Sequence, residues 1–321
     1  MKSISQLTDF YYKTLYPTLQ KLETKRKQLR YRITIIGVAL AFMVVLIAIG
    51  LKSTIMQSPD ILFFLGAAYI GIGTVIYKII TKNYTKEFKN KIISPLIKEI
   101  DSNLSYTSTL HIPSHHFIRS KIFTKKPDRF SGNDYVRGNI DGVNIQFSDI
   151  HAEVKDRDSD GKKYYETIFK GLFIVSEFNK NFKGQTIILP DIAQSTFGDL
   201  IGGWLQSNNM NRDQLVKMDN TTFEKEFVVY STNQIEARYI LSHSLMEKLL
   251  NFQKRSKHPV SISFVGGSIY IAIKSNEDQF EPTIFHSLLD YKVAMEYVNT
   301  LHLAIGLVQE LKLNQKLWSK T

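Results

Sequence analysis

The chain contains no cysteine among its 321 residues. This absence excludes disulfide frameworks, thiolate metal sites and cysteine nucleophiles. The sequence also lacks a glycine loop of the phosphate-binding type, the paired histidines of zinc proteases and the nucleophile turn of α/β hydrolases. We therefore expect no cofactor, and we expect a protein that is not an enzyme.

Most of the chain has no excess of positive over negative charge. The formal net charge is +11, of which residues 1–32 supply +6 and residues 78–100 supply +4. From residue 101 onward, 26 basic residues stand against 25 acidic ones. A domain balanced in this way has no general electrostatic footprint for DNA or RNA, so nucleic acid is not an expected partner.

Charged side chains are absent from two long stretches near the N-terminus. Residues 33–51 are uncharged, and residues 61–77 form a second uncharged run that extends to residue 80 if Lys78 reaches toward the headgroups. At ~1.5 Å per helical residue, the first run covers about 28 Å, close to the hydrocarbon thickness of a bilayer. The sequence predicts a two-helix transmembrane hairpin over residues 33–80, with spans at 33–51 and 61–80 and a short loop at 52–60.

Basic residues flank the two spans on the same side, and this sets the predicted orientation. Lysine and arginine beside a short span are retained in the cytoplasm, and the connecting loop holds only Lys52. Both termini are therefore predicted to be cytoplasmic, in an integral protein of a bacterial cytoplasmic membrane. We expect the flanking cations at the membrane surface: Lys25, Arg26, Lys27, Arg30, Arg32, Lys78, Lys82, Lys86 and Lys89.

Apolar residues recur at helical spacing on both sides of the hairpin. Before it, the stripe comprises Leu7, Tyr11, Leu15, Leu19 and Leu22, and after it Phe88, Ile92, Leu96 and Ile100. This spacing predicts a cytoplasmic N-terminal helix over residues 1–32 and a juxtamembrane helix over 81–110, kinked at Pro17 and Pro95. The two helices either cover each other's apolar stripe or form a lever or partner-binding coil.

The remaining residues, 111–321, have the pattern of a cytoplasmic α+β domain. Alternating apolar residues predict strands at 143–147, 167–179, 185–189 and 226–230, with turns around 179–181 and 183–184. Gly266 and Gly267 separate two further alternating runs, which predicts a β-hairpin. Helices are expected at 197–206, from 231–233 to 255, and at 283–313. Antiparallel strands with segregated helices indicate the α+β class.

Three segments of this domain resemble a bacterial family built around a domain of unknown function. These are residues 171–191, residues 227–241 with the sequence FVVYSTNQIEARYIL, and the hairpin at 263–272. The resemblance covers nearly the whole chain, including the two early apolar runs. It implies a bacterial cytoplasmic-membrane protein, often encoded near LemA-type membrane proteins, which makes such a protein a candidate partner. It transfers no catalytic residue.

Two groups of acidic residues and histidine are weak candidates for a metal site. Asp149, His151 and Glu153 fall at alternate positions and would share one face of a strand, where they could bind a metal or act as acid and base. The same alternation is typical of any exposed strand face.

The second group opens like a calcium-binding loop. Asp156, Asp158, Asp160 and Gly161 match its first positions, but the twelfth position would be Thr167 instead of the glutamate that closes such a loop. Since the segment lies between two predicted strands, a solvated hairpin loop is the favoured interpretation.

These patterns favour a membrane-anchored cytoplasmic interaction or scaffold module that is not an enzyme. Its expected partners are the lipid bilayer and another membrane protein or membrane-associated protein, and a second copy of the chain is a further candidate. One alternative is a lipid-responsive or ligand-binding domain at the inner membrane surface, where each nearby lysine adds ~1 kcal/mol to binding of anionic lipid. Another is a metal-assisted hydrolase that uses Asp149, His151 and Glu153.

Overall fold

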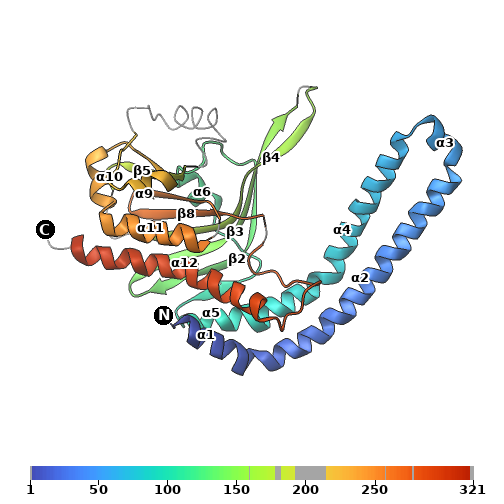
Figure 1. The fold of residues 1–321 in the computed structure, drawn as a ribbon, viewed down its shortest axis with the longest axis horizontal. Coiled ribbons are helices and arrows are strands. Elements are labelled where there is room, and N and C mark those ends of the chain that lie inside the picture. The colour runs from blue at the N-terminus through green and yellow to red at the C-terminus, as the bar shows by residue number, and fades with distance from the viewer. Residues whose placement is uncertain are drawn as a thin grey trace. The chain divides into compact units, whose positions relative to one another are not determined.

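A computed structural model describes residues 2–158, 160–177, 182–191, 215–256, 258–276 and 278–318. It is an α+β structure in which long N-terminal helices are followed by an eight-stranded antiparallel sheet with helices (Figure 1), as the sequence predicts. The chain divides into two compact units. Ser5–Leu96 and Phe280–Glu296 form one, here called the helical unit; Met1–Ile4, Ile97–Gln279 and Tyr297–Thr321 form the other, the sheet unit.

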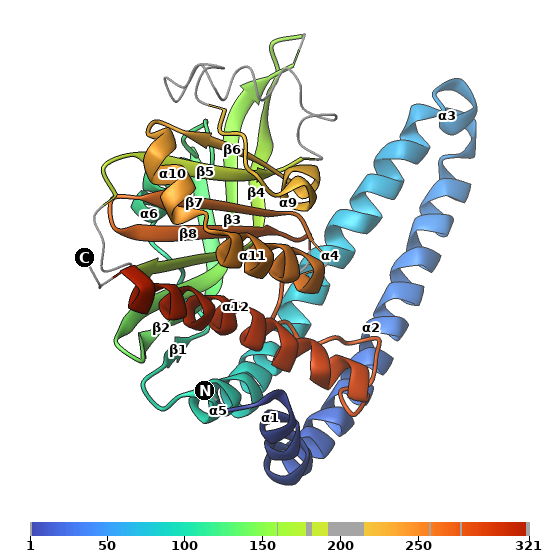
Figure 2. The same ribbon diagram turned by 60° about the vertical axis from the view of Figure 1, so that its left-hand side comes forward.

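Two long antiparallel helices dominate the helical unit (Figure 2). α1 (Ile4–Phe10) continues through a π-helical turn, η1 (Tyr11–Leu15), into α2 (Tyr16–Gly50). The returning helix α4 (Asp60–Phe88) continues through a second π-helical turn, η2 (Lys89–Ile93), into α5 (Ser94–Ile100). A short helix, α3 (Lys52–Gln57), connects α2 to α4, so the predicted loop at 52–60 is largely helical.

Each π-helical turn lies just before a proline. Pro17 is the second residue of α2, and Pro95 is the second residue of α5. Because proline has no N–H group, the carbonyl four residues earlier lacks its α-helical donor, and a locally wider turn relieves the mismatch. The distortions predicted at Pro17 and Pro95 therefore take the form of π-helical turns.

The apolar runs of α2 and α4 remain uncovered by other parts of the structure. Both helices contain an 18-residue apolar window long enough to cross a membrane, and none of the residues in either window is buried. The large side chains exposed over more than 60% of their surface include Val38, Phe42, Ile49, Phe63, Phe64, Ile70 and Ile79. Between the two apolar runs, the Tyr69 hydroxyl donates a hydrogen bond to the Gly37 carbonyl, at 3.4 Å.

The sheet unit contains eight strands in the order β1-β2-β3-β4-β8-β7-β5-β6, and every neighbouring pair is antiparallel. The strands are β1 (Ser105–Thr107), β2 (Arg129–Ile140), β3 (Val143–Arg157), β4 (Lys163–Glu177), β5 (Gln185–Pro190), β6 (Phe227–Ser231), β7 (Val260–Val265) and β8 (Ser268–Lys274). The predicted hairpin joins β7 to β8, and its two glycines have φ values of +56° and +81°. These left-handed conformations explain why glycine occupies both positions.

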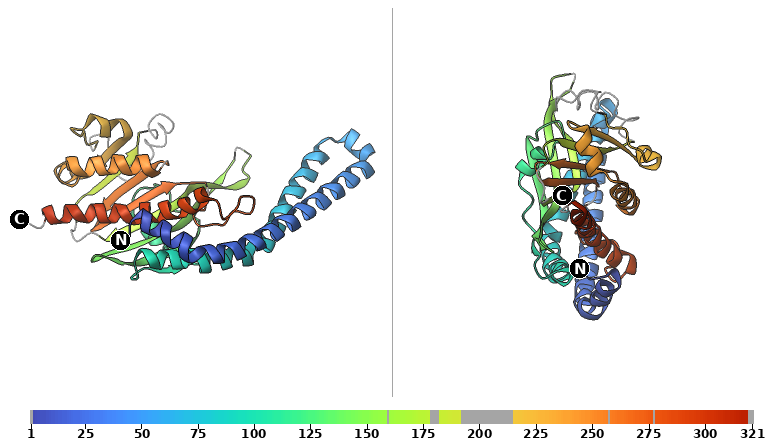
Figure 3. Two further views of the ribbon diagram at one scale, coloured as in Figure 1. Left: turned by 60° about the horizontal axis from the view of Figure 1, so that its bottom comes forward. Right: turned by 90° about the vertical axis from the view of Figure 1, so that its left-hand side faces the viewer.

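Helices cover the two faces of the sheet unequally. The short helix α6 (Ser114–Arg119) lies on one side, whereas α9 (Thr221–Glu226), α10 (Gln234–Ile240), α11 (His243–Ser256) and the C-terminal helix α12 (Tyr291–Trp318) lie on the other (Figure 3). Under α6, Phe117 packs against Phe169 and Phe173 of β4, with ring centroids 6.2 and 5.7 Å apart. Since side chains alternate along a strand, the residues of β4 directly next to Phe169 and Phe173 face the opposite side of the sheet, where the larger group of helices lies.

Three predicted helices differ from the structure. The juxtamembrane helix expected over residues 81–110 ends at Ile100, where the Asp101 side chain accepts a hydrogen bond from the Asn103 N–H in a turn, and residues 105–107 form the strand β1. The segment expected to be one helix up to residue 255 is broken into α10 and α11, because Leu241 leaves the helical conformation and Ser242 accepts a hydrogen bond from the N–H of Leu245. The last helix begins at Tyr291, and residues 280–290 form neither helix nor strand. The helix predicted at 197–206 and the turn at 179–181 lie outside the described residues.

Candidate functional site

The helical unit contains an almost completely buried ion pair on α2. Glu23 and Arg26 are 5% and 4% exposed. The Arg26 Nε and one terminal nitrogen donate to the two Glu23 carboxylate oxygens at 2.8 and 2.7 Å. Burial raises the pKa of Glu23, but hydrogen bonds from Arg26 and from the Leu288 N–H outweigh burial and leave this pKa below its usual value. The pair is therefore fully charged at neutral pH.

This ion pair also holds residues 280–290, here called the linking segment. The other terminal nitrogen of Arg26 donates to the Ile284 carbonyl, and the Leu288 N–H donates to Glu23 Oε2 at 3.0 Å. The Tyr11 hydroxyl donates to the Leu288 carbonyl at 3.4 Å. Side chains of η1 and α2 thus satisfy three backbone groups of a segment that has no secondary structure of its own.

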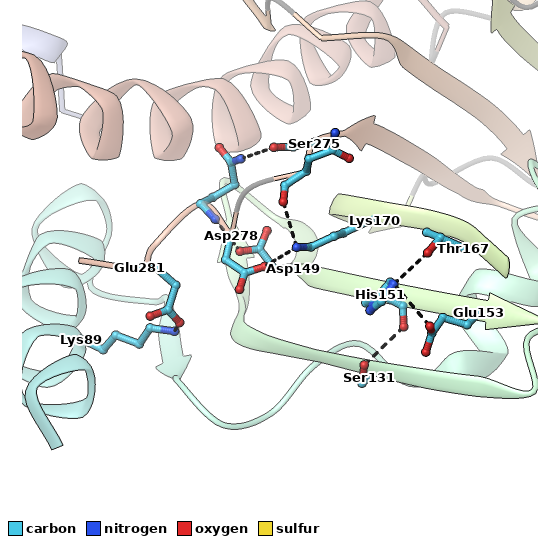
Figure 4. A network of polar contacts seen from close by, with 12 residues as sticks. Lys89, Ser131, Asp149, His151, Glu153, Thr167, Lys170, Ser275, Asp278 and Glu281 are labelled. Carbon is cyan, nitrogen blue, oxygen red and sulfur yellow. Dashed lines mark hydrogen bonds and ion pairs between the residues drawn. The ribbon is translucent and has the colours of Figure 1, made fainter. Parts of the chain in front are cut away.

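A second ion pair connects η2 to the linking segment. Lys89 Nζ lies 2.5 Å from Glu281 Oε1; Lys89 is 3% exposed, whereas the Glu281 side chain is 35% exposed (Figure 4). Close to the first pair, the buried Tyr84 hydroxyl has no hydrogen-bond partner among the described residues. Burial, the largest effect on this group, raises the pKa of Tyr84. The two ion pairs can fix the path of the linking segment, and their charged groups are engaged in these contacts.

Two of the cations predicted at the membrane surface are buried instead. Arg26 and Lys89 point into the helical unit, where Glu23 and Glu281 neutralise them. Counting flanking charges identifies the cytoplasmic side of a span but does not distinguish the faces of a helix, so it could not predict that these two side chains are buried. The other predicted cations are exposed: Lys25, Lys27, Arg30, Arg32, Lys78, Lys82 and Lys86.

A basic pocket lies between α2 and the end of α4 with η2. It has a volume of about 310 Å³ and is lined by Thr18, Lys21, Leu22, Lys25, Glu87 and Lys91. Glu87 contacts two of these lysines: its carboxylate oxygens lie 2.6 Å from Lys25 Nζ and 2.8 Å from Lys91 Nζ. The hydrogen bonds from these lysines lower the pKa of Glu87. Three ammonium groups and one carboxylate leave the lining with an excess of two positive charges.

The sheet unit does not gather Asp149, His151 and Glu153 into one cluster (Figure 4). His151 Nε2 lies 3.1 Å from Thr167 Oγ1 and 3.9 Å from Glu153 Oε1. Asp149 is 3% exposed and accepts a hydrogen bond from the Gln279 N–H at 2.8 Å. Among the described residues, no group of three or more histidines and acidic residues is placed to hold a metal ion. The geometry gives no support to the metal-assisted hydrolase.

The aspartates of the calcium-like sequence shape a β-turn region between β3 and β4. Asp158 Oδ1 accepts hydrogen bonds from the N–H groups of Asp160 and Lys162, at 3.1 and 2.7 Å. Asp156 lies 4.0 Å from Lys125 Nζ. These carboxylates serve the loop and its neighbours.

Sequence reasoning missed both buried ion pairs, although a signal was present. Arg26 lies four residues after Leu22 and Lys89 three residues before Ile92, so each continues a buried apolar stripe. A cation on such a stripe needs a buried acidic partner. Glu23, three residues before Arg26, could have been identified in this way, whereas Glu281 lies too far along the chain for spacing to reveal it.

Comparison with known protein families gives a match to part of the chain, but the matching family has no assigned function. Residues 167–313, from β4 into α12, match the model of a family described as "Protein of unknown function (DUF3137)". This match confirms the predicted resemblance to a domain of unknown function for that part of the chain. The expected link to LemA-type proteins stays a prediction.

No curated protein matches the sequence. Among solved structures, the mycobacterial trehalose monomycolate transport factor A, TtfA, matches with 10% sequence identity and a TM-score of 0.33, over 64% of this chain and 92% of that chain. A similarity this low carries no information about the function of the present chain.

Proposed function

We propose that this protein is a membrane-anchored interaction module, in which α2 and α4 cross a bacterial cytoplasmic membrane and both termini lie in the cytoplasm. One observation carries the proposal: neither apolar window has a buried residue. An apolar surface of this length in water would be costly and prone to aggregate, whereas the hydrocarbon of a bilayer solvates it.

The exposed basic residues support the proposed orientation. Lys27, Arg30 and Arg32 precede the first apolar run, and Lys78, Lys82 and Lys86 follow or end the second. Exposed lysine and arginine next to short spans favour the cytoplasmic side. The connection between the spans, by contrast, holds one basic residue, Lys52.

The interaction role rests on how the chain is organised. The linking segment belongs to the helical unit, yet it connects β8 to α12 of the sheet unit. The ion pairs Glu23–Arg26 and Lys89–Glu281 bind this segment to the proposed anchor. A domain attached to its anchor at several points along the chain suits the presentation of a surface to a membrane partner, for which a LemA-type protein or a second copy is a candidate.

Placement is tested by extraction and by reporters of topology. The full-length chain should stay with the membrane fraction at high salt and alkaline pH and enter solution with detergent. A reporter fused after residue 321 should be active in the cytoplasm, and one inserted at Met56 of α3 should be active outside it. Recovery in the aqueous fraction, or an exported C-terminal reporter, contradicts the anchor.

Partner binding is tested by photo-crosslinking in intact cells. Ile235 and Tyr239 lie four residues apart on α10 and are 83% and 53% exposed. A photoreactive residue at Ile235 should give a light-dependent adduct with a membrane or membrane-associated protein, and the same residue at the exposed Lys155 is the matched control. Absence of an adduct from Ile235 and from Tyr239, together with no co-purifying membrane protein, contradicts the interaction role.

A further inference from the structure

The basic pocket of the helical unit has the composition of an anion-binding site. Lys21 and Lys25 project from α2 and Lys91 from η2, so the cations converge from two parts of the chain. Lys25 and Lys91 each give hydrogen bonds to Glu87, while Lys21 has no ion-pair partner within the described residues. An ammonium group carries three donors, so these lysines retain donors for a further acceptor.

We propose that this pocket binds a soluble phosphate-bearing anion, held by Lys21, Lys25 and Lys91 and by the Thr18 hydroxyl. A volume of about 310 Å³ lies at the lower end of the range for small-molecule sites. Phosphate oxygens accept several charge-assisted hydrogen bonds at once, and this suits three ammonium groups around one cavity. Glu87 prearranges two of the lysines and limits the affinity through its own charge.

Phosphate can come from a lipid headgroup or from a solute, and position along the helices favours the solute. Lys25 lies eight residues before the first apolar run and Lys91 eleven residues after residue 80. At ~1.5 Å per residue, these separations amount to about 12 and 16 Å along the helix axes. The headgroup layer is only ~5–8 Å deep on each side of the hydrocarbon. This choice of source rests on the proposed membrane anchor; the binding chemistry of the pocket does not.

The test uses the full-length chain in nanodiscs of phosphatidylcholine, titrated calorimetrically with inorganic pyrophosphate. The double variant Lys21→Gln/Lys91→Gln should weaken binding by at least about tenfold, because it removes two charge-assisted contacts. Lys27→Gln/Lys86→Gln removes the same charge from exposed residues that do not line the pocket, and it should bind like the natural chain. Glu87→Gln should tighten binding by roughly threefold, since it removes the opposing charge.

Each other outcome overturns the inference. Equal weakening in the two double variants would show general charge attraction, and no saturable binding of pyrophosphate would remove the site. If the lysine variants instead lose only an effect of adding 20% phosphatidylglycerol to the nanodiscs, the ligand is a lipid headgroup. Membrane fractionation of the same variants separates the proposals, because failure of the pocket leaves the chain in the membrane fraction.

Discussion

Glu23 and Arg26 lie one helical turn apart on α2, share two hydrogen bonds, and together satisfy the Leu288 N–H and the Ile284 carbonyl. This single pair therefore joins a long helix to a segment more than 250 residues later in the sequence. Because both side chains are almost completely buried, each depends on the other for neutralisation.

Removing one member of this pair should strongly destabilise the helical unit. Arg26→Met leaves the Glu23 carboxylate buried without its cation, and the expected loss is roughly 3–5 kcal/mol. Glu23→Leu combined with Arg26→Met removes both charges and should be markedly less harmful. Hydrogen exchange at the Leu288 amide measures the effect, with Lys27→Met as an exposed control. Equal protection in the natural chain and in Arg26→Met would contradict the structure.

The same carboxylate should make the unit sensitive to acid. Since the folded-state pKa of Glu23 is lowered from 4.5, its ionisation stabilises the folded state above about pH 4.5. This stabilisation is lost as the pH falls from there through the folded-state pKa. The protection factor of the Leu288 amide should drop in this window, and Glu23→Gln should reduce the dependence. An identical pH profile in Glu23→Gln would show that another group is responsible.

The Lys89–Glu281 pair should respond asymmetrically to the loss of either partner. Lys89 is nearly fully buried, so Glu281→Gln removes the negative charge that faces a buried cation and should cost roughly 3 kcal/mol. The Glu281 side chain is 35% exposed and keeps contact with water, so Lys89→Met should cost only about 1 kcal/mol. Unfolding of the two variants in detergent, compared at the same pH, gives the order. A reversed order would contradict the burial of Lys89.

Gly171 in β4 should tolerate no side chain. Its φ is +142°, and an added Cβ would lie 2.1 Å from the Ile273 carbonyl oxygen, where β4 pairs with β8. Gly171→Ala should destabilise the sheet unit by more than about 3 kcal/mol, because backbone strain and a clash in the ladder act together. Gly142→Ala is the matched control: φ is +84°, but an added Cβ would meet no atom within 4 Å apart from those of its chain neighbours. Thermal unfolding should rank Gly171→Ala well below Gly142→Ala.

Local patterns predicted the parts of the fold that depend on local chemistry. The alternation around Gly266 and Gly267 identified β7 and β8, because the turn and both strands are adjacent in sequence. The position of β5 between β7 and β6 could not be predicted in this way, since it depends on pairing between strands that lie far apart in the sequence.

For the polar sites, too, sequence reasoning predicted the contacts that are local in the chain and missed those between distant residues. The acidic residues of the β3–β4 turn were correctly favoured as a loop, because Asp158 forms contacts with residues two and four positions later. The burial of Arg26 and Lys89 was not predicted, because their partners include residues of the linking segment, whose path no local pattern reveals. The basic pocket was missed for a related reason, since it needs the pairing of two helices.

The π-helical turn η2 keeps one continuous apolar row pointing the same way. Tyr84, Phe88, Ile92 and Leu96 follow one another every four residues, and all are buried. In an uninterrupted α-helix, four residues turn through about 400°. A row of residues spaced by four would therefore shift around the helix axis by about 40° from one residue to the next. The wider turn between Lys89 and Ile93 takes up this excess rotation. Deleting one residue there would restore an ideal helix yet rotate everything beyond it by about 100°, aiming the downstream row at solvent.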